Sequence, residues 1–167
     1  MVVHSAGVLL YQVNGPITDQ AALRVWIAHM GGPFWARKDE HAWSIPKGEY
    51  DLDEDPLAAA LREFEEEIGA SAPSVEYASL GSFRQPSGKI IAVFAAETDF
   101  QPAQIVSNTF SVEWPKGSGT VRDYPEIDDA RWVDEPEARI KLVRGQLPIL
   151  DALARHIRSR GGGRAGD

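Results

Sequence analysis

The apolar positions of this chain fall into short runs of β-branched and aromatic residues, a pattern that is typical of strands. These runs are Ser5–Val13, Leu23–Met30, Ala42–Pro46, Val75–Arg84, Lys89–Thr98 and Ala130–Val133. Turn-forming residues around Gly15 separate the first two runs, and turn-forming residues around Gly88 separate the fourth and the fifth. The pattern therefore predicts a β-hairpin at the second of these turns.

The apolar spacing changes to a helical period in two parts of the chain. Residues 56–68 form one helical segment, and Pro136–Arg158 predicts two short helices that are broken near Gly145–Pro148. Residues 31–41 form a loop that contains Gly-Gly-Pro, and Gln101–Tyr124 shows no regular period, which indicates an irregular insertion. Strands lie on both sides of a central helix and terminal helices follow, so the fold class is α/β.

The central helix carries two different faces. At about 100° per residue, Leu57, Leu61, Phe64 and Ile68 fall within a stripe about 60° wide, which we expect to face the core. Glu63, Glu66 and Glu67 have i, i+3, i+4 spacing and share a separate face, which also takes in Ala59 and Ala60 one turn earlier. We expect these alanines to leave space for a ligand. Glu65 points elsewhere and is expected to face solvent.

Carboxylates that share one helical face repel each other, so a fold that keeps them usually offsets them with cations. Mg²⁺ and Mn²⁺ prefer carboxylate, carbonyl and water ligands, and such ions screen the charge of a diphosphate. A nearby carboxylate then positions or deprotonates a water for attack on phosphorus. The residues therefore indicate hydrolysis of a phosphoanhydride bond.

Length, composition and charge indicate the number of domains, the compartment and the classes of partner. The 167 residues suit one domain, which we place at residues 1–158 with a disordered tail at 159–167. The chain has no cysteine, no apolar run long enough to span a membrane and no signal-like N-terminus, so we expect a cytoplasmic protein. The net charge of −8 argues against stable binding to nucleic acid or to an acidic membrane. The oligomeric state stays open.

The stretch from Gly48 to Ala70 resembles the Nudix box, G-x5-E-x7-R-E-U-x-E-E-x-G-U, in which U is a bulky apolar residue. The matching residues are Gly48, Glu54, Arg62, Glu63, Phe64, Glu66, Glu67 and Gly69, and only the small Ala70 departs from the motif. Seven fixed positions make a chance match very improbable, on the order of 10⁻⁸ at average residue usage. The resemblance implies a Nudix hydrolase with an α/β/α sandwich around a mixed sheet.

The resemblance also implies roles for the box residues. Glu66 and Glu67 match the principal metal ligands, Glu63 matches a further ligand that is the base in some members, and the neighbourhood of Gly48 supplies a backbone carbonyl. Arg62 matches an arginine that holds a box glutamate, although an ion pair with Glu66 is an alternative geometry, and Glu54 is a supporting residue. Family members often use one more glutamate outside the box; we prefer Glu126 over Glu113 and Glu97.

Other segments resemble the diadenosine polyphosphate hydrolase branch of the family. Trp43-Ser44-Ile45-Pro46-Lys47-Gly48 is similar to its W-x-x-P-K-G approach to the box, and residues 126–133 are similar to its E-x4-R-W stretch. This likeness makes Lys47, Lys89 and His41 candidate substrate contacts. Trp35 is the candidate exposed aromatic, and Phe110, Trp114 and Tyr124 of the insertion are either a nucleobase platform or packing residues.

Several functions therefore remain open. The first is a metal-dependent pyrophosphohydrolase of a small nucleotide, with dinucleoside polyphosphates such as diadenosine tetraphosphate ahead of nucleoside triphosphates and ADP-ribose. The second is an RNA 5′-end pyrophosphohydrolase, which needs a basic path that the sequence does not display outside Arg155–Arg164. The third is a non-catalytic nucleotide sensor, which the complete set of box glutamates disfavours.

Overall fold

A mixed sheet of seven strands forms the centre of the computed structural model, which describes residues 2–16 and 19–162. The strands are β1 (His4–Val13), β2 (Leu23–Met30), β3 (Trp43–Ser44), β4 (Lys47–Glu49), β5 (Ala78–Arg84), β6 (Ile90–Glu97) and β9 (Ile127–Asp134). β1 lies beside β6 in parallel register, and the other pairs are antiparallel. β4 pairs with β1, which brings Gly48 opposite Ala6.

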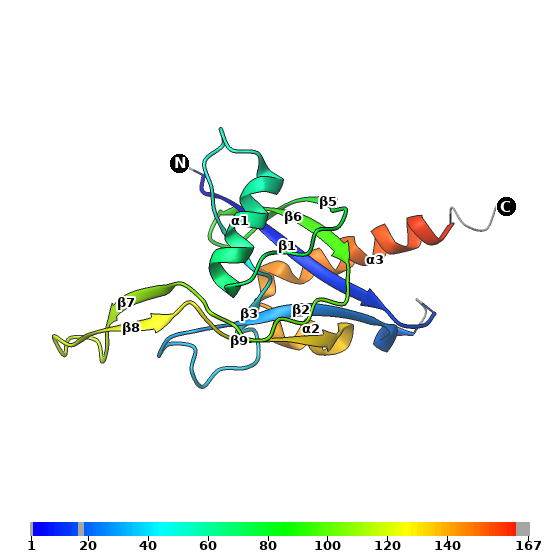
Figure 1. The fold of residues 1–167 in the computed structure, drawn as a ribbon. Helices are drawn as coiled ribbons and strands as arrows, with labels where there is room; N and C mark the ends of the chain where they lie inside the picture. Colours follow the sequence, from blue (N-terminus) through cyan, green and yellow to red (C-terminus); the bar gives the residue numbers. More distant parts are fainter. Residues whose placement is uncertain (1, 17–18, 163–167) are drawn as a thin grey trace.

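Helices cover both faces of this sheet (Figure 1). Alternate residues of β1 point to opposite faces: Val8 and Leu10 pack with α1 (Pro56–Ile68), while Leu9 and Tyr11 belong to the other core cluster. That second cluster includes residues of α2 (Glu135–Lys141) and α3 (Leu147–Gly162). The predicted α/β/α sandwich with a mixed sheet is therefore confirmed.

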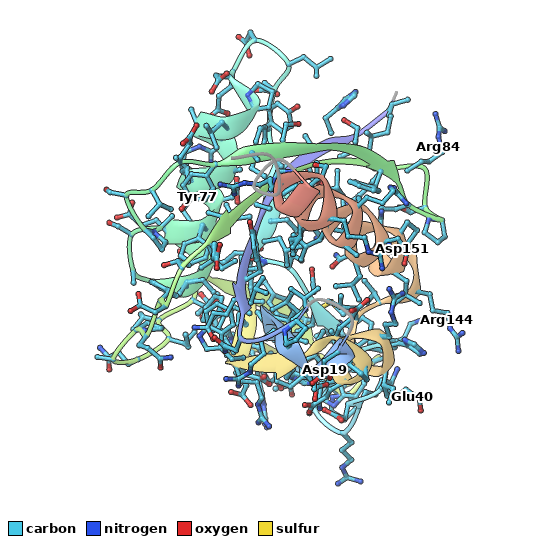
Figure 2. All side chains as sticks on the ribbon, turned by 90° about the vertical axis from the view of Figure 1, so that its right-hand side faces the viewer. Asp19, Glu40, Tyr77, Arg84, Arg144 and Asp151 are labelled. Atoms are coloured by element: carbon cyan, nitrogen blue, oxygen red, sulfur yellow. The ribbon has the colours of Figure 1, made fainter. Side chains whose placement is uncertain are left out.

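The α2–α3 layer is tied together by an ion pair. Arg139 of α2 lies 2.8 Å from Asp151 of α3, and the short 3₁₀ turn η2 (Arg144–Gln146) connects the two helices. Figure 2 shows Asp151 and Arg144 on the side of the molecule that α3 covers, with Tyr77 on the opposite side of the view. Among the described residues, no helix is both long and apolar enough to cross a membrane.

The sequence pattern indicated that the insertion at Gln101–Tyr124 is irregular, but part of it is regular. It contains a two-stranded antiparallel hairpin of β7 (Thr109–Glu113) and β8 (Val121–Pro125), which extends away from the sandwich in Figure 1. The strands escaped prediction because each is only five residues long, and because β8 places Arg122 and Asp123 together between Val121 and Tyr124, which breaks the alternation that marks a strand.

Other elements also differ from the sequence expectation: β3 covers only Trp43–Ser44, and β5 begins at Ala78. β9 begins at Ile127 and not at Ala130, and a short 3₁₀ turn, η1 (Gln20–Ala22), precedes β2. α3 continues to Gly162, so the expected disordered tail has to be corrected for residues 159–162, which are helical. Residues 163–167 of that tail lie outside the described residues.

Candidate active site

The helix α1 has well-formed ends that fix its register. Asp55 accepts a hydrogen bond from the Ala58 N–H at 3.0 Å as the N-cap, and Pro56 occupies the first turn. At the other end Gly69 has φ 80°, a left-handed conformation that favours glycine, and its N–H donates to the Glu65 carbonyl at 2.8 Å. These ends determine which face each glutamate of the helix occupies.

The buried face of α1 overlaps the predicted stripe at Phe64 and Ile68 but is shifted toward Ala59 and Ala60. Ala59, Ala60, Phe64 and Ile68 are fully buried against the sheet, whereas Leu57 and Leu61 are only half-buried. The expectation that the alanines leave space for a ligand is therefore wrong. Their small side chains let the helix approach β1 closely, and that approach sets the height of the acidic face above the sheet.

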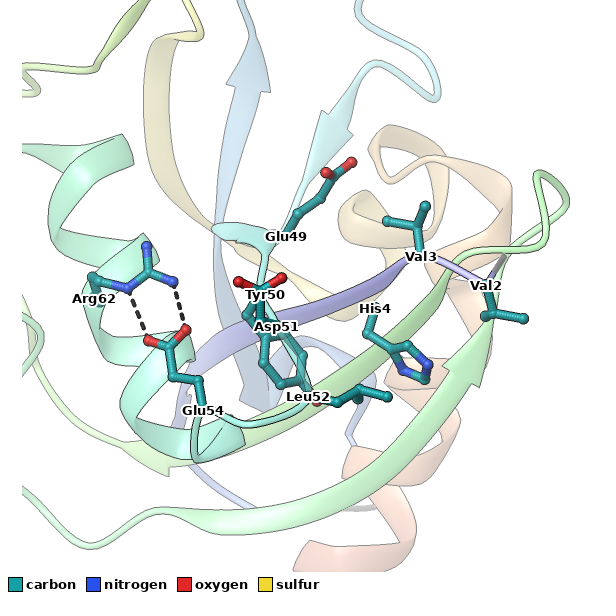
Figure 3. A pocket seen from close by; sticks show the side chains of 9 residues that line it. All are labelled: Val2, Val3, His4, Glu49, Tyr50, Asp51, Leu52, Glu54 and Arg62. Atoms are coloured by element: carbon teal, nitrogen blue, oxygen red, sulfur yellow. Dashed lines mark hydrogen bonds and ion pairs between the residues drawn. The ribbon is translucent and has the colours of Figure 1, made fainter.

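Arg62 links three of the box glutamates. Its Nε and Nη2 each donate to one oxygen of Glu54 at 3.0 Å, a bidentate pair, and its Nη1 donates to Glu63 at 2.8 Å. The bond to Glu66 is longer, at 3.4 Å. Figure 3 shows the Arg62–Glu54 pair on the wall of a cavity of about 500 Å³, which Glu49 and Asp51 also line. Arg62 therefore holds the helix face and the preceding loop together.

Gly48 gives Glu63 the space that its carboxylate occupies. A Cβ atom on Gly48 would lie 1.8 Å from Glu63 Oε2 and 2.1 Å from its carboxyl carbon. No side chain fits at this position without displacing Glu63. Because β4 is fixed to β1 by its pairing, the sheet and the helix together determine where this carboxylate lies.

Glu67 is the most deeply enclosed carboxyl of the site. Burial raises its pKa to about 7, and the charges of Glu126 and Glu63 add to the rise. The Lys47 ammonium and the Lys47 N–H, which donates to Glu67 Oε2 at 3.0 Å, act in the opposite direction. A carboxyl group that titrates near neutral pH is able to accept or release a proton under physiological conditions.

Glu126 lies outside the box in the sequence, but its charge is coupled to those of Glu66 and Glu67. Burial raises its pKa, and the charge of Glu66 raises it further while Lys47 lowers it. Two backbone bonds hold this segment in place, from Asn108 N–H to the Glu66 carbonyl at 3.1 Å and from Glu126 N–H to the Asn108 carbonyl at 2.8 Å. The two alternative glutamates lie elsewhere, Glu113 at the outer end of β7 and Glu97 at the end of β6.

The donor set fits a hard divalent cation. Glu63, Glu66, Glu67 and Glu126 supply carboxylate oxygens only, and burial together with mutual repulsion raises the pKa of Glu63, Glu67 and Glu126. A cation would relieve that repulsion. Among the described residues, no three acidic or histidine side chains are yet gathered closely enough to hold a metal ion. Arg62 donates to only one oxygen of Glu63 and to only one oxygen of Glu66, so it orients both carboxylates.

The candidate substrate contacts outside the box are spread more widely. Lys89 Nζ lies 2.9 Å from Glu49, the residue that follows Gly48. His41 Nδ1 lies 2.7 Å from the Leu142 carbonyl oxygen, which ties this residue to the end of α2. Trp35 is half-buried against the core, and the exposed aromatic of its loop is Phe34, with 58% of its surface accessible.

Sequence reasoning missed the residue that supports the approach to the box. Gln146 is completely buried; its Oε1 accepts from the Ile45 N–H at 2.9 Å, and its Nε2 donates to Ser44 Oγ at 2.8 Å. This amide fixes the backbone two residues before Lys47. No local signal marks it, because Gln146 is about 100 residues from its partners in the chain.

The structure has a mixed sheet between two helix layers, and the glutamate-rich helix α1 lies beside Gly48 of β4. These features define the class of protein that the Nudix resemblance implied. A family profile of the NUDIX domain matches residues 5–153, so the chain belongs to this family. The prediction of a Nudix hydrolase that acts on phosphoanhydride bonds is confirmed at the level of the family.

Individual relatives are more distant. The chain is 32% identical over 117 residues to a protein of Acidiphilium cryptum named RNA pyrophosphohydrolase. This aligned region covers 69% of this chain and 71% of the relative. Among solved structures, a C. elegans Ap4A hydrolase binary complex has a TM-score of 0.60 at 18% identity, over 95% of this chain and 99% of that chain. The NUDIX domain of Shewanella oneidensis NrtR, complexed with ADP ribose, scores 0.59 at 17% identity, over 94% and 89% of the two chains. At these identities the structures show the shared fold.

Proposed function

We propose that this protein hydrolyses a phosphoanhydride bond in a nucleoside diphosphate derivative, in a reaction that depends on Mg²⁺ or Mn²⁺ and releases a mononucleotide. The observation that carries this proposal is a set of carboxylates beside the Lys47–Gly48 strand: Glu67 accepts a hydrogen bond from the Lys47 N–H at 3.0 Å, and the Glu63 carboxylate lies against Gly48. Burial and the charges of neighbouring glutamates raise the pKa of Glu63, Glu67 and Glu126. Carboxylates held together in this way are suited to binding cations that accompany a polyphosphate.

The metal ligands in this proposal are Glu63, Glu66, Glu67 and the Gly48 carbonyl, with Glu126 as a further ligand. When bound, the metal supplies charge neutralisation for the diphosphate and lowers the pKa of a water. Arg62 keeps Glu63 and Glu66 in position from one side, and Lys47 adds a positive charge next to Glu67.

The chemical step is attack by water on phosphorus. A new P–O bond forms, the bridging P–O bond of the anhydride breaks, and the leaving phosphate takes the electron pair of the broken bond. A glutamate of the acidic face accepts the proton of the attacking water. Glu63 and Glu67 are the candidates for this base, since burial raises the pKa of both carboxyl groups.

Among substrates we favour dinucleoside polyphosphates such as diadenosine tetraphosphate. The support is the approach Trp43-Ser44-Ile45-Pro46-Lys47-Gly48, which resembles that branch of the family. A second candidate is the 5′ end of triphosphorylated RNA, which the name of the Acidiphilium cryptum relative favours. The net charge of −8 places RNA second, because RNA binding depends largely on neutralising phosphates. In either case we place the reaction in the cytoplasm.

A substrate panel tests this proposal directly. Diadenosine tetraphosphate, ATP, ADP-ribose and a 5′-triphosphorylated oligoribonucleotide are incubated with Mg²⁺ or Mn²⁺, and chromatography resolves the products. We expect a mononucleotide product with the dinucleotide as the best substrate, and no turnover after chelation. If no member of the panel is cleaved, the sensor alternative gains support and the catalytic proposal fails.

Replacing Glu67 with Gln tests the assignment of the site. The substitution removes one buried charge at nearly constant volume, so we expect kcat to fall by about 10²–10⁴-fold, the usual contribution of a general base or a positioned ligand. Glu65→Gln is the matched control, because Glu65 lies on the same helix with an exposed side chain. If Glu67→Gln turns over as fast as the control, the site is assigned to the wrong residues.

A further inference from the structure

The hairpin β7–β8 begins and ends at the acidic site. On one side Val106 N–H donates to the Ile68 carbonyl at 2.9 Å, and Asn108 N–H donates to the Glu66 carbonyl. On the other side the strand β8 ends at Pro125, next to Glu126. The base of the hairpin is therefore hydrogen-bonded to the C-terminal end of α1 and does not lie on a remote part of the surface.

Two aromatic side chains face each other at the root of this hairpin. Phe110 and Tyr124 are register partners, and their ring centroids lie 6.2 Å apart at an interplanar angle of 38°. Both side chains are half-buried, so each keeps part of its surface accessible. Because Tyr124 precedes Glu126 by two residues, the pair lies within about 7 Å of that residue along the strand.

A glycine of the neighbouring loop fixes the position of the Phe110 ring. A Cβ atom on Gly32 would lie 2.5 Å from the tip of the ring, and the φ of 96° at Gly32 disfavours other residues as well. The preceding residue is also held at the hairpin, because Gly31 N–H donates to the Glu126 carbonyl at 2.8 Å. The loop and the hairpin thus hold the aromatic pair in one place relative to Glu126.

We infer that Phe110 and Tyr124 form the subsite that binds the nucleobase of the substrate, an inference that rests on the proposed function. A nucleotide whose phosphates lie at the carboxylates has to place its base beyond them. Aromatic rings stack on every nucleobase, and each such contact typically contributes about 5- to 160-fold in affinity. Arg122 lies on the same face of β8 as Tyr124 by strand alternation, which adds a cation beside this subsite.

The remainder of the hairpin supplies a control. Trp114 follows Phe110 by four residues, which places it about 13 Å farther from the carboxylates along the chain. It is an aromatic residue with 38% of its surface accessible, so it offers the same type of contact at the wrong distance. A general apolar surface would use Trp114 as readily as Phe110, whereas a base subsite at the root would not.

The test compares the best substrate of the panel with its abasic analogue, in which hydrogen replaces each base. We expect Phe110→Leu and Tyr124→Leu to raise KM for the base-containing substrate by about 5- to 160-fold and to leave KM for the analogue within about twofold. Tyr124→Phe keeps the ring and should retain the wild-type KM, and Trp114→Leu should have no effect. Thermal unfolding of each variant verifies that the fold is kept.

Equal changes of KM for both substrates, or no change for either, overturn the inference and leave the proposed function intact. If the wild-type protein cleaves no substrate, the proposed function fails, and binding then decides the inference separately. In that case AMP and ribose 5-phosphate are titrated, and the ring resonances of Phe110 and Tyr124 are followed by NMR. Shifts with AMP alone support the base subsite, and the absence of such shifts overturns it.

Discussion

Replacing Gly48 with alanine adds one methyl group at the point where β4 meets the acidic helix. Gly48 is not among the glycines with positive φ, so alanine fits the backbone conformation without strain. The new Cβ would lie 1.8 Å from Glu63 Oε2, 2.1 Å from Cδ and 2.7 Å from Cγ. The effect of the substitution is therefore steric and acts on one carboxylate.

The size of the effect follows from these distances. Non-bonded heavy atoms approach to about 3.5 Å, so the Glu63 carboxylate has to retreat by roughly 1.5–2 Å. A displacement of about 1 Å in a catalytic group costs about 100-fold in rate, and we expect kcat to fall by at least about 100-fold. Stability should change little, because the exposed Arg62–Glu63 bond contributes at most about 1 kcal/mol, or about 2–4 °C in Tm.

The assay measures kcat and Tm for Gly48→Ala, for Glu63→Ala and for the double variant. If Gly48→Ala acts only through Glu63, the double variant has the same kcat as Glu63→Ala alone. Gly145→Ala is the matched control, because its Cβ would also collide with a side chain, 2.5 Å from Gln85 Oε1, but outside the site. We expect this control to keep its wild-type kcat.

Two results would refute this reasoning. A Gly48→Ala variant that keeps kcat within threefold of wild type shows that the position of Glu63 is unimportant for the reaction. A double variant that is much slower than Glu63→Ala shows that the methyl group acts by another route, such as a shift of β4. In the second case the sheet, and not the carboxylate, determines the rate.

Two further predictions concern stability. The Glu67 carboxyl has its pKa raised from 4.5 to about 7, so the folded state binds a proton more tightly than the unfolded state. Stability of the metal-free protein therefore falls as pH rises from about 4.5 to 7, by an upper value of about 3 kcal/mol. Thermal unfolding with a chelator should show a smaller fall for Glu67→Gln, and an equal fall in both proteins would contradict this origin. For Gln146→Leu, two buried groups lose their partners, and we expect urea unfolding to report a loss of about 2–4 kcal/mol. A loss below about 1 kcal/mol would show that Ser44 and Ile45 find other partners.

Local patterns in the sequence were sufficient for the catalytic helix. The helical period of residues 56–68 and the spacing of Glu63, Glu66 and Glu67 depend on hydrogen bonds and angles between residues a few positions apart. The same holds for strands β1, β2 and β6, in which apolar residues predominate. These features were predicted from neighbouring residues, because neighbouring residues determine them.

Tertiary structure decided which partners those residues obtain. Arg62 binds Glu54 in bidentate fashion and only weakly reaches Glu66, its neighbour at i+4, because the loop before the helix folds back onto it. Ala59 and Ala60 pack against the sheet, which no helical projection reveals. Likewise Phe34, and not Trp35, is the exposed aromatic of its loop.

The sequence by itself determined that an acidic helix of the Nudix type exists, and with it the bond that the protein acts on. Only the tertiary structure brought Glu126 to the box glutamates and set the hairpin with Phe110 and Tyr124 beside them. The physical reason is that electrostatic repulsion and burial act through space. Glu126 raises the pKa of Glu67 across 59 positions of the chain, a relation that follows from the folded sheet and from no local spacing.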